Sequence, residues 1–138
     1  MKKKKNSRID TYPTIYYVDL VVANSSTTLE ELKKLYTYSD LEELDDFITN
    51  AECTTSTVIR KSDNKDCILV KLNRFTDIKS ISLHDDYINT IGHEAGHVVL
   101  DIYNHIRQAV NADSQEPFCY LLGWALECIN KTLQDEVK

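Results

Sequence analysis

The sequence predicts an α+β domain with a small, mainly antiparallel sheet of about three strands and two C-terminal helices. Runs rich in β-branched and aromatic residues occupy residues 12–23, 54–61 and 66–72, and such runs between turn residues are typical of strands. Two later segments, residues 86–105 and 118–129, repeat apolar residues with the helical period, which predicts amphipathic helices.

The first half of the chain is expected to hold one long strand and two helices. The strand is predicted from Tyr12 to Ala23, beginning after Pro13. Thr28-Leu29-Glu30-Glu31 matches a capping box, so a helix is expected from there to about Tyr36. A second short helix is predicted from Leu41 to Ile48, with Ser39 or Asp40 as its cap.

The middle of the chain predicts a hairpin followed by a loop. The β-prone runs at 54–61 and 66–72 flank the turn-rich residues 62–65, which favours antiparallel pairing of the two runs. Residues 73–83 have no clear period and are expected to be irregular. Asp77 and His84, in and beside this loop, are expected to be polar surface residues, although either could lie near a metal.

The helix over residues 86–105 is expected to begin at Asp85 or Asp86 and to have two different faces. Apolar residues form one stripe, and His93, Glu94, His97, Asp101 and Asn104 fall on the opposite arc. Gly92 and Gly96 lower helix propensity by about 1 kcal/mol each relative to Ala. Their presence predicts close packing against this helix.

Residues 93–97, His-Glu-Ala-Gly-His, form an H-E-x-x-H motif within that helix. Residues four apart lie on one helix face, so both imidazoles can reach one metal ion. Glu94 stands beside them as a carboxylate able to accept a proton from a water bound to Zn²⁺. His93 and His97 are therefore candidate zinc ligands and Glu94 is a candidate general base.

Catalytic zinc needs a third protein ligand, and Glu116 is the candidate. It lies nineteen residues after His97, at the start of the last predicted helix, for which Ser114 is a plausible cap and in which Pro117 falls in the first turn. If the preceding helix ends near residues 105–108, the remaining chain is long enough to return Glu116 to the metal. A helix unbroken to Asp113 would prevent this.

The motif and its continuation carry a resemblance. His-Glu-Ala-Gly-His followed by a Glu that opens a helix resembles the gluzincin branch of zinc metallopeptidases. The segment 114–124 is also similar to small zincin-like proteins encoded by bacteriophages and prophages. The resemblance covers residues 88–127, and the N-terminal half matches no family in this way.

The resemblance implies a minimal zincin-like metallopeptidase domain that binds Zn²⁺ through His93, His97 and Glu116 and uses Glu94 as general base. Asp101, one turn after His97, is a candidate for orienting an imidazole and a rival third ligand. The large peptidases of this branch add a C-terminal domain with an oxyanion-stabilising His that this chain lacks. Tyr120 is therefore the candidate oxyanion donor, with Tyr103 and Tyr87 as further candidates.

Length and composition are consistent with one domain over residues 1–138. A chain of 138 residues with 42% hydrophobic and 28% charged residues is typical of a single soluble domain. The net charge of −6 argues against nucleic-acid binding. Residues 1–10 are expected to be a disordered basic terminus, and Pro13 and Asp19 interrupt any signal-peptide core. No apolar run is long enough for a membrane span, so a cytoplasmic protein is expected.

The chain has four cysteines, at positions 53, 67, 119 and 128. No two of them form a C-x₂-C pair, so the sequence does not predict a zinc ribbon. Reduced thiols are expected, although a Cys53–Cys67 bridge stays open for an exported protein. His105 and Trp124 are expected to be ordinary helix and core residues.

Three functional interpretations remain open from the sequence. The first is a peptidase acting on a peptide or protein substrate, which could pair with an exposed sheet edge. The second is a phage accessory or assembly protein with a structural or vestigial zinc site and no turnover. The third is a small binding module in which His93 and His97 are ordinary polar residues. The oligomeric state is not predicted.

Overall fold

The structure is a computed structural model that describes residues 6–39, 41–44, 51–74 and 83–137. The strands are β1 (Ile9–Pro13), β2 (Asp19–Ala23), β3 (Tyr36–Tyr38), β4 (Cys53–Arg60) and β5 (Lys65–Leu72). The helices are α1 (Leu29–Leu35), α3 (Leu83–His105) and α4 (Gln115–Leu133), with short 3-10 helices η1 (Ala112–Ser114) and η2 (Gln134–Val137). The α+β class predicted from the sequence is confirmed.

The sheet is larger than expected and is mixed, because three of its four described strand pairs are antiparallel and one is parallel. Its five described strands lie in the order β1-β2-β5-β4-β3. The β4–β5 hairpin is present as predicted, with Arg60 opposite Lys65. However, β2 pairs with β5 in parallel, with Leu20 opposite Ile68. The prediction of about three strands is therefore wrong, because it merged β1 with β2 and missed β3.

The long strand predicted over residues 12–23 is in fact the hairpin β1–β2. The turn between the strands is held by Thr14, whose hydroxyl donates to the Val18 carbonyl and accepts from the Tyr16 N–H. Tyr17 in this turn has φ 60°, a left-handed conformation that ends extended structure. Pro13 is the last residue of β1 rather than a residue before the strand.

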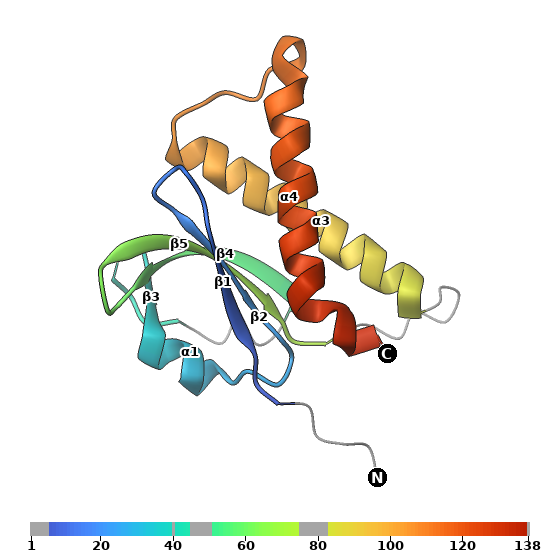
Figure 1. The fold of residues 1–138 in the computed structure, drawn as a ribbon. Helices are drawn as coiled ribbons and strands as arrows, with labels where there is room; N and C mark the ends of the chain where they lie inside the picture. Colours follow the sequence, from blue (N-terminus) through green and yellow to red (C-terminus); the bar gives the residue numbers. More distant parts are fainter. Residues whose placement is uncertain (1–5, 40, 45–50, 75–82, 138) are drawn as a thin grey trace.

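Two layers of helix cover the sheet, one on each face (Figure 1). Helices α3 and α4 lie on one face, where Leu20, Val22, Ile68 and Val70 pack against residues of both helices such as Val98. Helix α1 lies on the other face, where the intervening residues of the same strands join a second core with Leu32. The period-2 alternation of side chains along β2 and β5 divides the two cores.

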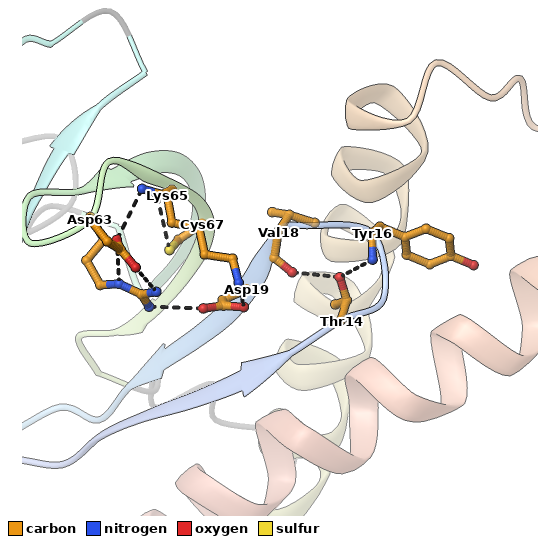
Figure 2. Close-up of polar contacts among 8 residues, drawn as sticks. Thr14, Tyr16, Val18, Asp19, Asp63, Lys65 and Cys67 are labelled. Atoms are coloured by element: carbon orange, nitrogen blue, oxygen red, sulfur yellow. Dashed lines mark hydrogen bonds and ion pairs between the residues drawn. The ribbon is translucent and has the colours of Figure 1, made fainter.

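One end of the sheet is fixed by a buried carboxylate (Figure 2). Asp19 at the start of β2 has a side chain only 5% exposed, and it pairs with Arg60 of β4 and Lys65 of β5, each at 3.0 Å. Arg60 also binds Asp63 in the β4–β5 turn at 2.8 Å. These contacts join strands that are distant in the sequence, which holds β4 in register beside the central strands.

The predicted helices are found with different limits. The capping box at Thr28 and Glu31 is formed and begins α1, as predicted. Leu41 has φ 67° and residues 41–44 are not helical, so the helix predicted from Leu41 is wrong for these residues. Its remainder, residues 45–48, lies outside the described residues, as do the possible cap Asp40 and the loop residue Asp77.

Helix α3 contains residues 93–97 and spans more than the predicted segment. It begins at Leu83, so Asp85 and Asp86 lie in its first turn rather than capping it. The close packing expected at Gly92 and Gly96 is wrong. A Cβ at either position would meet no described atom within 4 Å, beyond the helix backbone.

The N-terminal segment and the cysteines can also be compared with their predictions. Asn6 and Arg8 exchange hydrogen bonds with Asn24, and β1 begins at Ile9, so the segment expected to be a disordered terminus joins the fold from Asn6 onward. All four cysteines are free, as expected. No helix in the described part is long and apolar enough to cross a membrane.

Candidate functional site

His93 and His97 lie one turn apart on α3, and their Nε2 atoms are 3.0 Å from each other. The ring centroids are 4.7 Å apart and the ring planes make an angle of 75°. Both side chains are exposed. The i, i+4 spacing of the sequence thus brings two ring nitrogens together, as expected on one helix face.

This separation fits a shared metal ion. Zinc binds imidazole nitrogen at about 2.0–2.1 Å, so two nitrogens in a tetrahedral site are about 3.3–3.4 Å apart. The 3.0 Å between the two Nε2 atoms differs from that value by a few tenths of an ångström. Two neutral imidazoles at this distance can hold a metal, or can share one N–H between them.

Glu94 points from α3 toward β4 and is only 5% exposed. Its Oε2 accepts a hydrogen bond from the Thr55 hydroxyl of β4. Its other oxygen, Oε1, has no hydrogen-bond partner among the described residues. One oxygen of the carboxylate is therefore held by the sheet, and the other is left to accept a proton.

Two adjoining hollows between α3 and β4 surround these groups. They have volumes of about 310 and 200 Å³, and both are lined by Cys53, His93 and Glu94. The smaller one is also lined by Ala51, which precedes β4, by Thr54 and Thr55 of β4, and by His97 of α3. We call these two hollows together the α3–β4 cleft. The pair of histidines and the carboxylate thus share one open space large enough for water and part of a substrate.

The edge of β4 beside this cleft is open in the described structure. β3 pairs with β4 only from Val58 to Arg60, so no described strand pairs with residues 53–57 on their outer side. The Asn73 N–H, just after β5, donates to the Glu52 carbonyl, just before β4. Glu52 therefore directs its main-chain groups toward β5, and this fixes which residues of β4 direct theirs toward β5 and which direct them away. Cys53, Thr55 and Thr57 therefore direct their main-chain N–H and C=O groups outward.

Burial is the main cause of the pKa shifts of two side chains in and near the cleft, Cys53 and Asp101. Burial raises the pKa of the Cys53 thiol strongly, and the Glu94 carboxylate raises it further. In the metal-free protein Cys53 therefore stays protonated at neutral pH. Burial also raises the pKa of Asp101, and the neighbouring His97 opposes that increase. Asp101 thus lies near His97, but it makes no hydrogen bond to it in the described part of the chain.

Glu116 and Tyr120 are not brought to the histidine pair. Glu116 is exposed in the first turn of α4, and no third His, Cys, Asp or Glu among the described residues joins His93 and His97 in a metal-binding group. Tyr120 is 76% exposed and lines a different cavity, together with the β1–β2 turn. Neither residue lies in the α3–β4 cleft.

The remaining candidates also lie elsewhere or outside the described structure. Tyr103 packs edge-to-face on Phe118, and the Tyr87 hydroxyl donates to Asn130. His105 lies 3.8 Å from Asp66, and Trp124 is partly buried against the core, as expected. Asp77 and the side chain of His84 are outside the described residues.

Thr55 is the site residue that sequence reasoning missed. The run Thr-Thr-Ser-Thr predicts a strand, and its alternation indicates that Thr55 and Thr57 share a face. Nothing in the run indicates that this face lies against Glu94.

No family model, curated protein or solved structure compared with the chain matches it.

Proposed function

We propose that this chain is a zinc-dependent peptidase in which His93 and His97 bind the metal and Glu94 is the general base. The observation that carries the proposal is the 3.0 Å separation of the two Nε2 atoms, beside a buried carboxylate of which one oxygen has no partner among the described residues. When bound, zinc would supply a water of lowered pKa and polarise the scissile carbonyl.

Glu94 performs the proton transfers in this proposal. Its Oε1 takes one proton from the attacking water, and the remaining hydroxide oxygen forms a bond to the carbonyl carbon. Oε1 of Glu94 then gives this proton to the peptide nitrogen as the C–N bond breaks. The products are one carboxylic acid and one amine; the acid then passes its proton to the amine or to solvent and becomes a carboxylate, and Glu94 ends ionised as it began.

The open edge of β4 supports a peptide rather than a compact substrate. An extended chain can add to a sheet edge through main-chain hydrogen bonds, and residues 53–57 offer outward N–H and C=O groups beside the α3–β4 cleft. Such a chain would pass the histidine pair with its peptide bonds exposed. The substrate class is therefore an extended peptide or an unfolded protein segment.

The third metal ligand is tested together with the first two. Zinc content of the purified protein is measured by elemental mass spectrometry in the wild type and in variants of candidate ligands: His93→Ala, His97→Ala, Glu116→Gln, Asp101→Asn and Asp77→Asn. We expect about one zinc per chain in the wild type and loss in both histidine variants. The variant among the last three that loses zinc identifies the third ligand, and the sequence predicts Glu116.

His105→Ala is the matched control, because it removes an imidazole from the end of the same helix and should keep the zinc. Glu94→Gln should also keep the zinc, because Glu94 is not a ligand in this proposal. The zinc-loaded wild type should cleave members of a random decapeptide library, and Glu94→Gln and EDTA should both abolish cleavage. A wild type without zinc, even when refolded with the metal, refutes the proposal.

A second candidate is a metal-binding protein without turnover, such as a phage accessory or assembly factor. It is favoured by the lack of a third ligand among the described residues. It predicts that the wild type binds zinc but cleaves no peptide. In that case Glu94→Gln should have the same zinc content as the wild type and should also cleave no peptide.

A further inference from the structure

Thr55 lies at the junction of the two features that the proposed reaction needs. Its hydroxyl donates to Glu94 Oε2, while its main-chain N–H and C=O point to the open edge of β4. Its neighbour across the hairpin is Val70, in the middle of β5. Thr55 thus lies opposite Val70 in the sheet register, while its own main-chain groups face an edge that no described strand occupies.

The hydrogen bond from Thr55 restricts the base. A glutamate side chain has three rotatable bonds, so an unanchored carboxylate samples many orientations. Hydrogen bonds to a carboxylate are strong, and burial strengthens them further. With Glu94 5% exposed, this bond holds Oε2 against β4 and leaves Oε1 as the oxygen available to accept a proton.

We propose that Thr55 is a positioning residue that aligns Glu94 for proton transfer and couples this alignment to a peptide paired with the open edge of β4. The inference rests on the proposed function. A peptide bonded to the outward groups of Thr55 fixes the backbone that carries the hydroxyl. Binding at the edge and orientation of the base then depend on the same residue.

The role predicts an effect on kcat rather than on binding of zinc or peptide. Thr55→Val keeps the shape and the β propensity of the side chain but removes the hydroxyl. We expect normal zinc content and a KM within about three-fold of wild type. We expect kcat to fall about 10- to 100-fold, because misplacement of a catalytic group by about an ångström has effects of this order.

Two further variants separate positioning from folding. Thr55→Ser retains the donor and should recover kcat to within about three-fold of wild type. Thr11→Val makes the same change on a strand away from the cleft, at an exposed side chain of β1 with no hydrogen bond in the described structure, and should leave kcat unchanged. The substrate is the peptide that the zinc-loaded wild type cleaves fastest in the decapeptide library.

A readout without turnover tests the contact itself. The carboxyl carbon of Glu94 is observed by NMR in metal-free protein labelled with ¹³C at glutamate carboxyls, and Glu94→Gln assigns the signal. We expect Thr55→Val to shift this resonance and Thr11→Val to leave it in place. An unshifted resonance in Thr55→Val overturns the inference, with or without measurable cleavage.

The outcomes distinguish this inference from the proposed function. Zinc-loaded wild type that cleaves no peptide overturns the proposed function, and the role of Thr55 in a reaction falls with it. Cleavage by the wild type with an unchanged kcat in Thr55→Val overturns the inference alone. Reduced kcat in Thr55→Val, recovery in Thr55→Ser and a shifted Glu94 resonance support both.

Discussion

Replacing Gly92 or Gly96 by alanine should stabilise the protein without weakening metal binding. Both glycines lie inside α3, at least eight residues from its ends, and neither has a positive φ. A Cβ at either position would meet no described atom within 4 Å, outside the helix's own backbone. The substitution therefore adds helix propensity, about 1 kcal/mol per site, with no steric penalty to offset it.

The expected shift in melting temperature follows from the size of the chain. An unfolding entropy of about 2.1 cal/mol/K per residue gives roughly 0.29 kcal/mol/K for this chain, so each alanine should raise Tm by roughly 3 °C. The double variant should gain roughly 7 °C, since both changes act through helix propensity. Calorimetry measures these shifts, and elemental mass spectrometry should find the zinc content unchanged.

Gly123→Ala provides the matched control, because Gly123 lies inside α4 and its Cβ would also meet open space. It should stabilise by the same amount as the α3 variants. A lower Tm or lost zinc in Gly96→Ala, together with a higher Tm in Gly123→Ala, would refute the reasoning. That result would mean that something packs over α3 beside His97 which the described residues do not supply.

Three further predictions concern the buried charges and the metal. Burial lowers the pKa of Lys71 to about 8, so between pH 8 and 10.5 the unfolded chain keeps a proton that the folded chain has released. The contribution of Lys71 to the free energy of unfolding should therefore rise by about 3 kcal/mol across this range. Urea unfolding of wild type and Lys71→Met measures it, and a difference that does not vary with pH would contradict it. Asp19→Asn should lower the free energy of unfolding by about 3 kcal/mol, because it leaves Lys65 and Arg60 without their buried carboxylate; a loss below about 1 kcal/mol in urea would show that the pair contributes little. Zinc at 100 times its Kd should stabilise the wild type by about 2.7 kcal/mol, and an equal stabilisation of His97→Ala in thermal unfolding would exclude the histidine pair as its site.

Local signals in the sequence predicted local structure correctly. The capping box at Thr28 needs only residues three apart, and it is formed. The stripe of apolar residues over residues 86–105 predicted α3 because a helix shows its buried face with a period of 3.6. The meeting of His93 and His97 follows from the same geometry.

Errors arose where a local signal had two interpretations. Pro13 favours a strand that begins after it, whereas in the structure it ends β1, and Thr14 then closes the turn with its own hydroxyl. The Tyr-Thr-Tyr segment at residues 36–38 is β-prone, but the helix predicted up to Tyr36 concealed β3. Parallel pairing of β2 with β5 joins residues almost fifty apart, and no pattern within either strand indicates it.

The position of Glu116 shows why a spacing argument is incomplete. The sequence predicted that the chain could return Glu116 to His97 if the preceding helix ended near residues 105–108, and α3 does end at His105. That condition shows only that the chain is long enough for Glu116 to reach His97. It does not determine on which side of α3 the chain returns. The face of α3 with His93 and Glu94 lines a cleft against β4, whereas Pro117, in the first turn of α4, borders the β1–β2 turn. Which side of α3 the last helix occupies is decided by burial of Ala125, Cys128 and Ile129 near β2, so the packing of the end of α4 determines where its first residues lie. Loss of zinc in Glu116→Gln would therefore imply that the start of α4 moves toward His97 when the metal binds.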